Sequence, residues 1–319
     1  VLMSQVNAQW QFLVIFGTLI GLGLSSHDVV TLSTIARWFP RRRGIMSGVV
    51  KVGTAIGQVA LPPIAALLIV AYGWRTALFV LGITASVLLL IAALSMQRPP
   101  APAAGTSNIM TGASFVEARQ APVARVFWTL CATQFLFFPT LMSVPLHLAV
   151  HVIDLGMTQT LAATMLSVIG AASIAGRLTM GALVDRIGGK MAYTICLLVL
   201  LVSLAALTLI TAHGGLFVVV AIYGFSHGAL FVVVSPTVAE YFGMRAHGAI
   251  FGTVLFFGTL GGSLGPILTG WVFDSFGSYT PAFITLALSA AIALVLVRTL
   301  PSPKSEGLNA QASPTPPAP

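Results

Sequence analysis

Long runs without a charged side chain dominate this chain. Five of them reach the roughly 20 residues that a helix needs to cross about 30 Å of hydrocarbon, and they cover Thr76–Gln97, Val126–Ile153, Leu155–Gly176, Ala246–Phe273 and Ser275–Val297. Hydrophobic residues make up 57% of the 319 positions and charged residues only 7%, with a mean hydropathy of +0.99. A soluble domain of this size does not have that balance. The sequence therefore predicts an all-α integral membrane protein surrounded by a lipid bilayer.

The remaining apolar segments bring the expected number of membrane spans to nine. They cover residues 11–36, 45–71, 77–97, 125–150, 159–184, 190–212, 215–240, 248–273 and 280–300. If the N-terminus lies outside, twelve of the fifteen Lys and Arg residues fall in inside segments or at their span ends, and only Arg75 falls outside. Inside loops of membrane proteins carry such an excess of Lys and Arg. We therefore predict a multi-pass protein of the cell membrane, with its N-terminus outside and its C-terminus in the cytoplasm.

The composition also excludes several classes of function. The net charge of +8 arises at span ends, where basic residues have no interleaved aromatic residues, so no nucleic-acid partner is predicted. The seven acidic residues are dispersed, and the sequence has no His/Cys metal spacing, no phosphate loop and no supported Ser-His-Asp arrangement. We therefore expect no enzyme activity, no metal site and no cofactor.

An internal repeat relates the first two spans to two later ones. A shift of 204 residues superposes Gly44 on Gly248, Gly48 on Gly252, Gly57 on Gly261, Pro62 on Pro266 and Gly73 on Gly277. This agreement in glycine and proline indicates a parallel repeat of six spans. The first half then holds only three spans, and we expect about three helices to be missing at its N-terminus.

A Pro/Ala-rich segment divides the chain. Residues 98–124 begin with RPPAPAAGTSN and contain Ser114-Phe-Val-Glu117, a pattern typical of a capping box at the start of a helix. We predict that residues 1–97 are the remnant of an N-terminal half, 98–124 a cytoplasmic linker and 125–300 a six-helix C-terminal half. The tail, residues 301–319, is rich in Pro, Ala and Ser and is expected to be disordered in the cytoplasm.

Arg177 lies within an apolar run, and its position indicates a function. An arginine at the centre of a bilayer helix costs at least about 2.5–3.5 kcal/mol, so such a residue usually faces a cavity or a partner. Its planar guanidinium can bind a carboxylate through two parallel hydrogen bonds. The alternative is that Arg177 extends to the cytoplasmic face, because Asp185 follows only eight residues later.

Other polar residues within spans are candidates for coupling and substrate binding. His27 and Asp28 lie near the middle of the first span, where a buried carboxylate beside a histidine can exchange protons. The alternative for Asp28 is a structural ion pair with Lys51 on the next span. His227 lies near the depth of His27 in the other half, so both histidines are expected to contact the substrate, with Gln134 as a weaker candidate. The alternative for His227 is a hydrogen bond between helices.

The segment Gly181-Ala-Leu-Val-Asp185-Arg186-Ile-Gly188-Gly-Lys190 resembles the loop signature of the major facilitator superfamily, G-x-L-x-D-R-x-G-R-K. Gly189 is the one departure, because a basic residue is usual there. The resemblance covers family helices 4–12 and implies the helical bundle of that superfamily. It also implies a cytoplasmic gate formed by Gly181, Asp185, Arg186, Gly188 and Lys190, in which the aspartate reaches the N-terminal end of the helix at Gly44–Ser47.

Further segments indicate a subtype. The segments Arg37-Trp-Phe-Pro-Arg-Arg-Arg-Gly44, Pro62-Pro63, Tyr72-Gly-Trp-Arg75 and Gly176-Arg177 resemble the monocarboxylate and oxalate–formate carriers. In such carriers a helix-eight arginine meets the substrate carboxylate, and the resemblance gives that role to Arg177. No lysine stands in the helix-eleven segment, where the oxalate type carries one, which counts against a dicarboxylate substrate.

The predicted function is secondary active transport of a small organic anion of the monocarboxylate kind by alternating access. Symport with protons is the expected coupling. The alternatives are exchange of one anion for another, efflux by a carrier of the same superfamily, and a truncated membrane fragment that does not transport.

Overall fold

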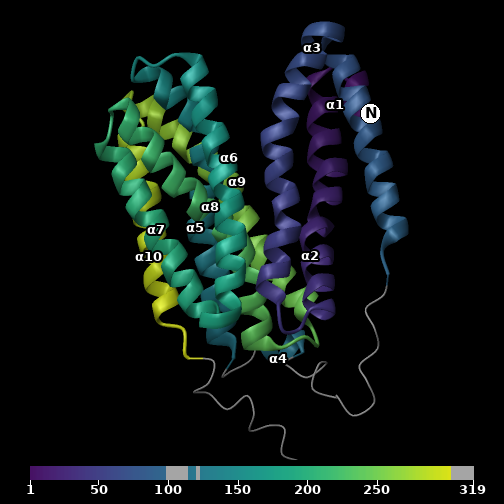
Figure 1. Ribbon diagram of the computed structural model, residues 1–319, viewed down its shortest axis with the longest axis vertical. Coiled ribbons are helices and arrows are strands. Elements are labelled where there is room, and N and C mark those ends of the chain that lie inside the picture. The colour runs from purple at the N-terminus through teal and green to yellow at the C-terminus, as the bar shows by residue number, and fades with distance from the viewer. Residues whose placement is uncertain (98–113, 120–122, 303–319) are drawn as a thin grey trace, which may run out of the picture.

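The computed structural model describes residues 1–97, 114–119 and 123–302, and all regular elements in these ranges are helices (Figure 1). In chain order they are η1 (Leu2–Gln5), α1 (Gln9–Val14), η2 (Ile15–Ile20), α2 (Gly21–Trp38), α3 (Arg43–Ser95), α4 (Phe115–Ala118), α5 (Ala124–Asp154), α6 (Gln159–Ile187), α7 (Gly189–Leu209), α8 (His213–Phe242), α9 (His247–Phe276) and α10 (Thr280–Arg298). Most of the predicted linker, and the predicted tail from residue 303, lie outside the described residues.

Eight helices in the described ranges are long and apolar enough to cross a membrane. One of them, Gln9–Trp38, is formed jointly by α1, η2 and α2. Another is α3, whose 53 residues are more than a single span needs. Within α3, Gly73 has non-helical φ and ψ angles. The chain turns back at this glycine, so α3 supplies two antiparallel spans (Figure 1). The described residues thus hold the nine predicted spans, and the all-α membrane fold is confirmed.

Gly73 and Gly277, which the sequence repeat superposes, both have a positive φ. Gly73 has a φ of 78° between the two spans of α3, and Gly277, its repeat partner, has a φ of 64° directly after α9. A positive φ costs glycine little, whereas it strains residues that carry a Cβ atom. Equivalent helices in the two halves therefore end with glycine in the same unusual region of φ.

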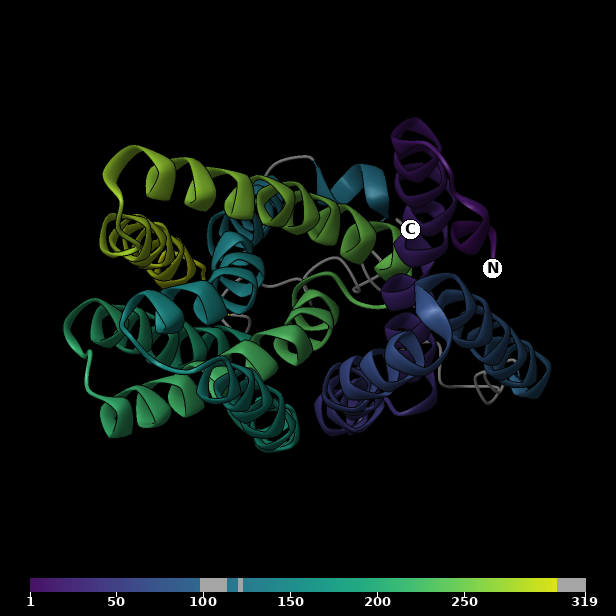
Figure 2. The same cartoon turned by 90° about the horizontal axis from the view of Figure 1, so that it is seen from above.

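Two groups of helices lie side by side (Figure 2). The first group contains α5 to α10, and the second contains α1 to α3. The main core of buried apolar side chains lies in the first group and includes Phe137, Tyr193 and Phe283. In the second group, the most apolar window of Gln9–Trp38 contains no buried residue. Burial in the described chain is therefore concentrated in the α5–α10 group.

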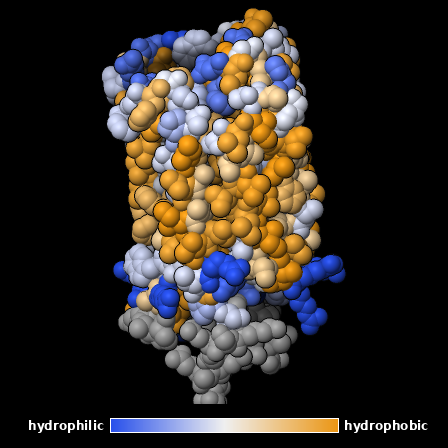
Figure 3. Space-filling view, turned by 90° about the vertical axis from the view of Figure 1, so that its left-hand side faces the viewer, coloured by the Kyte–Doolittle hydropathy of each residue, from blue (hydrophilic) through white to orange (hydrophobic). Residues whose placement is uncertain are grey.

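An apolar belt covers the face of the molecule that is formed by the α5–α10 group (Figure 3). Hydrophobic residues occupy the middle of this face, and hydrophilic residues lie in bands near its two ends. Large apolar side chains on α7 and α10, such as Val202, Ile292 and Val295, are exposed. Such a belt matches a hydrocarbon layer between two polar interfaces, because apolar surface is stable there without a protein partner.

The short helix α4 confirms the predicted capping box. The Glu117 amide donates to Ser114 Oγ at 3.2 Å, and the Ser114 amide donates to the Glu117 carboxylate at 2.6 Å. This backbone hydrogen bond lowers the pKa of Glu117. The Phe115 ring packs edge-on against Phe127, with 6.4 Å between centroids, and Ala118 is fully buried. These contacts hold α4 against the first turns of α5.

Candidate functional site

Small residues let α3 and α6 approach closely at one end of the bundle, which we call the loop end because it holds the turn between α2 and α3. A Cβ atom built on Gly48 would lie 2.4 Å from the carbonyl oxygen of Arg177, and one on Gly44 would lie 2.3 Å from that of Gly181. No side chain fits at those distances. Toward the opposite end the two groups of helices separate (Figure 1). The two groups are therefore in close contact at the loop end.

Two cationic side chains, one from each group of helices, lie near the ring of Phe231 on α8. Lys51 Nζ, from α3, lies 5.5 Å from the centroid of the Phe231 ring, and the guanidinium carbon of Arg177, from α6, lies 5.8 Å from it. The His227 and Phe138 rings lie 5.1 and 5.6 Å away. The negative face of an aromatic ring attracts cations at such distances. These residues form a cationic and aromatic site between the two groups.

Arg177 is buried and only partly paired. Its side chain is 1% exposed, and Nη1 donates to Ser173 Oγ at 3.0 Å. Its Nε has no hydrogen-bond partner among the described residues. Because Ser173 lies one turn farther from the loop end, the guanidinium does not extend to the predicted cytoplasmic face, and that alternative is wrong. A buried cation with an unused donor is unfavourable until an anion or water pairs with it.

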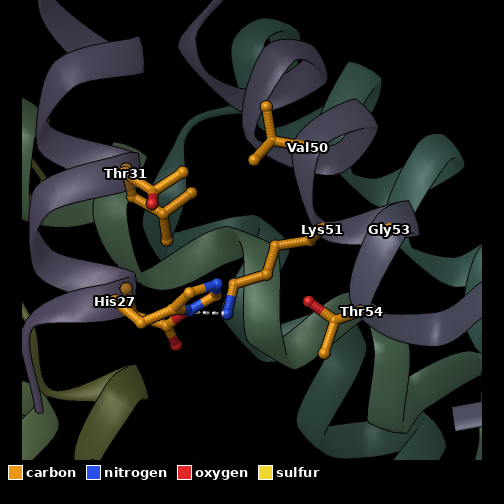
Figure 4. A pocket seen from close by; sticks show the side chains of 8 residues that line it. His27, Thr31, Val50, Lys51, Gly53 and Thr54 are labelled. Carbon is orange, nitrogen blue, oxygen red and sulfur yellow. Dashed lines mark hydrogen bonds and ion pairs between the residues drawn. The ribbon is translucent and has the colours of Figure 1, made fainter. Parts of the chain in front are cut away.

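Asp28 lies between two basic partners. Lys51 Nζ donates to Asp28 Oδ1 at 2.5 Å, and His27 Nδ1 lies 2.9 Å from the same oxygen. Lys51 reaches from α3 toward His27 on α2 (Figure 4), where these residues and Thr31 line a cavity of about 160 Å³. The contact required by a structural ion pair is present. A carboxylate that binds protons would have the same geometry, so both hypotheses for Asp28 stay predictions.

The two remaining candidates for substrate binding differ in their surroundings. His227 is 3% exposed, lies beside Phe231, and its Nδ1 has no partner among the described residues. Gln134 is fully buried, and neither amide atom has a hydrogen-bond partner in the described chain. A Cβ atom on Gly258 of α9 would lie 3.5 Å from Gln134 Cβ. The structure thus brings His227 into the Phe231 site, whereas it places Gln134 at the contact of α5 with α9.

Asp185 joins the two groups at the loop end. Its carboxylate accepts from the backbone amides of Gly44 and Ile45, at 2.7 and 3.1 Å, in the first turn of α3. Helix N-termini favour anions because their first amides lack intrahelical partners and the helix dipole is positive there. Gly181 provides the room, since a Cβ atom at this position would lie 2.7 Å from the Gly44 carbonyl oxygen. This is the contact that the family resemblance implies for Asp185.

The other residues of the predicted gate do not face the second group. Gly188 ends α6 with a φ of 81°, and Lys190 donates to the carbonyl of Leu300 after α10, within its own group of helices. Arg186 is exposed. Of the five residues predicted for the gate, the structure therefore brings only Gly181 and Asp185 against α3.

Gly189, the one departure from the loop signature, has a packing reason. A Cβ atom here would lie 2.3 Å from Thr237 Oγ1, so no larger residue fits without a shift of α8. The Gly189 amide also donates to the Glu240 carboxylate at 2.6 Å. The sequence gives no signal for Glu240, because a contact between the start of α7 and the end of α8 leaves no local pattern in either segment.

Phe231 and His247 were also missed. Phe231 follows His227 by one helical turn, so both share a helix face, but nineteen phenylalanines gave no reason to prefer this one. His247 is fully buried, with Nδ1 3.1 Å from Ser33 Oγ on α2 and Nε2 3.1 Å from the Ser235 carbonyl on α8. It therefore links the two groups near the loop end. Its position one residue before Gly248, at the start of a repeated span, was the available signal.

The sequence of this chain matches the model of one known protein family. The family model of the Major Facilitator Superfamily matches residues 1–212 and 149–319, which together cover the chain. The chain belongs to the Major Facilitator Superfamily. This confirms the family that the segment from Gly181 to Lys190 predicts. The chain is thus a membrane protein with several spans, from a superfamily of transporters.

Curated relatives of this superfamily member include transporters of the monocarboxylate type. Monocarboxylate transporter 13 of Rattus norvegicus is 30% identical over 295 residues, which cover 89% of this chain and 66% of the relative. The protein of the same name from Bos taurus is 31% identical over 290 residues, with the same coverage. The chain therefore spans 66% of the length of these relatives. Their type agrees with the predicted resemblance.

Solved structures of the superfamily share the fold. The human organic anion transporter MFSD10 (TETRAN) superposes with a TM-score of 0.69 at 20% identity, covering 93% of this chain and 73% of that chain. The transporter FucP of E. coli in the outward conformation gives a TM-score of 0.61 at 17% identity, covering 81% of this chain and 68% of that chain. At these identities the likeness concerns the fold alone.

Proposed function

We propose that this superfamily member transports a small monocarboxylate by alternating access, and that Arg177 binds the carboxylate. The observation that carries the proposal is the buried guanidinium with an unpaired Nε, placed between the two groups of helices beside Phe231. A carboxylate supplies the negative charge and the acceptor oxygens that such a group lacks. The two relatives named monocarboxylate transporter 13 support this substrate class.

Alternating access fits the way the two groups meet. Close contacts at the loop end involve glycines, the Asp185 carboxylate and the buried His247 side chain. Such contacts form and release without repacking a core, as rocking of one half against the other requires. We place the loop end in the cytoplasm, because the predicted Lys and Arg excess lies there. The close contacts at the loop end then correspond to a closed cytoplasmic side.

Proton symport is the coupling that we propose, with Asp28 and His27 as the groups that exchange the proton. Asp28 lines the 160 Å³ cavity and 29% of its side chain is exposed, so its carboxylate is accessible to a proton. Protonation would weaken its pairing with Lys51 and thereby change the contact between α2 and α3. Exchange of one anion for another is the alternative, and it would need no titration at Asp28.

Uptake of labelled lactate into proteoliposomes that contain the full chain tests the role of Arg177. Arg177→Ala is expected to reduce initial uptake by about thirtyfold or more, because removing one partner of a buried charge pair costs about 2–5 kcal/mol. Arg298→Ala removes an exposed arginine and is the matched control, with unchanged uptake. Unchanged uptake in Arg177→Ala would remove the assignment. A folded wild-type chain that takes up neither lactate, pyruvate nor oxalate would support the non-transporting alternative.

A further inference from the structure

We infer that Asp28 sets the charge of the anion that this site accepts, so that ionised Asp28 selects monoanions and its neutralisation admits short dicarboxylates. The inference rests on the proposed function, because it concerns the same site around Phe231. It follows from how three ionised groups are arranged on α2, α3 and α6. Lys51 and Arg177 are the cations, and Asp28 is the anion, which is paired with Lys51 and acts on Arg177 only through its charge.

The cations approach Phe231 from different helices. Lys51 Nζ and the Arg177 guanidinium carbon lie 5.5 and 5.8 Å from the same ring centroid. The Arg177 charge is repelled by Lys51 and attracted by Asp28, so the three charges act on one another as one cluster. His27 and His227, from α2 and α8, are the titratable neighbours of this cluster. With both histidines neutral, the ionised groups sum to a single positive charge.

Asp28 forms an ion pair with the ammonium group of Lys51. The Nζ–Oδ1 distance is 2.5 Å, and only 6% of the Lys51 side chain is exposed. While this pair holds, Arg177 is the cation with an unused donor, and one carboxylate neutralises it. A second carboxylate would meet the Asp28 charge without a free cation to pair with it. The site in this state therefore suits a monoanion.

Loss of the Asp28 charge changes this balance. Asp28 is the acidic group that acts on Lys51, so the Lys51 ammonium is then left without an acidic partner. This ammonium already lies over the Phe231 ring. Two unpaired cations near one ring suit a ligand with a carboxylate at each end. The chemical class is a short dicarboxylate such as malonate or oxalate. Coulomb attraction from one additional unpaired charge at this range is large enough to change the preference.

Equilibrium dialysis of the purified full chain against labelled lactate and labelled malonate, at neutral pH, tests the inference. Asp28→Asn is expected to raise the ratio of malonate to lactate affinity at least about tenfold. The double variant Asp28→Asn/Lys51→Met is expected to lose that gain, because the freed cation is gone. The matched control is Asp154→Asn, which removes an exposed carboxylate at the end of α5 and should leave the ratio unchanged.

The outcomes separate this inference from the proposed function. An unchanged ratio in Asp28→Asn, or a gain that survives the loss of Lys51, overturns the inference, even if Arg177→Ala still abolishes lactate binding. Lactate binding that survives in Arg177→Ala overturns the proposed function as well. If Asp28→Asn does not fold, Lys51→Met is measured alone. The site then carries no net positive charge, so lactate affinity should fall, and an unchanged affinity overturns the inference.

Discussion

Asp28 is a residue with two basic partners and access to a cavity. Lys51 and His27 both contact its Oδ1 atom, and 29% of its side chain is exposed. A carboxylate in this position can lose its partner when it binds a proton, and it can recover the partner when the proton leaves. At the scale of single residues, this is the property on which proton coupling depends.

Replacing Asp28 by Asn tests that property. Wild-type lactate uptake is expected to rise as external pH falls, because a proton enters with each anion. Asp28→Asn is expected to make uptake independent of external pH, since an amide does not titrate in that range. Initial rates in proteoliposomes over a series of external pH values measure the difference, with Asp154→Asn as the control that keeps the dependence. A variant that follows the wild-type profile would leave Asp28 as a structural partner of Lys51.

The helix α3 presents different surfaces along its first span. Gly44 and Gly48 face α6 at the loop end, where Gly48 lies against the carbonyl of Arg177. Lys51 follows three residues after Gly48 and points toward Asp28 and the Phe231 ring. A movement of α3 along α6 therefore also moves Lys51 relative to Arg177. At the scale of elements, this contact connects the loop end with the cationic site.

Enlarging Gly48 should open the loop end. Gly48→Ala is expected to destabilise the closed contact by about 1–3 kcal/mol, because the added carbon overlaps backbone atoms of α6. Gly57→Ala is the matched control on the same helix, since a Cβ atom there meets only Leu61 Cδ1, at 3.8 Å. Spin labels at Arg41 and Arg186, both exposed, report the separation. A distance distribution equal to that of wild type and Gly57→Ala would show that this contact does not hold the loop end closed.

The molecule as a whole has an unequal distribution of charge. The turn between α2 and α3 contains Arg41 and Arg42, both exposed at the loop end. The turn between α7 and α8, at the opposite end, contains no Lys or Arg and is followed by His213, the exposed first residue of α8. Because membrane insertion retains Lys and Arg loops in the cytoplasm, the loop end should lie inside.

Site-directed labelling tests this orientation. In intact cells, a membrane-impermeant maleimide should label His213→Cys and should not label Arg41→Cys. Permeabilised cells should give labelling of both, which controls for reactivity. Both native cysteines are buried, so background labelling is expected to be low. Labelling of Arg41→Cys in intact cells would place the loop end outside and would contradict the predicted topology.

Much of the fold followed from local sequence. Nine spans were expected from apolar length, and the structure places their ends within a few residues, with Gly73 dividing α3 into two of them. The capping box at Ser114 and the contact implied for Asp185 depend on short segments and helix ends. Such features are predictable because hydrocarbon permits few backbone conformations and helix N-termini favour anions wherever they occur.

The chemistry of the site needed the tertiary structure. The sequence by itself determined that Arg177, Asp28 and Lys51 lie within spans, because charge in an apolar run is conspicuous. Only packing decided that both cations lie near Phe231, that Arg177 turns toward Ser173, and that Glu240 holds the start of α7. Each of these contacts depends on which helices pack together or on which rotamer a side chain adopts. Both depend on neighbours that are distant in sequence. Apolar length specifies a helix locally, whereas the partners of a buried charge are set by which helix faces meet.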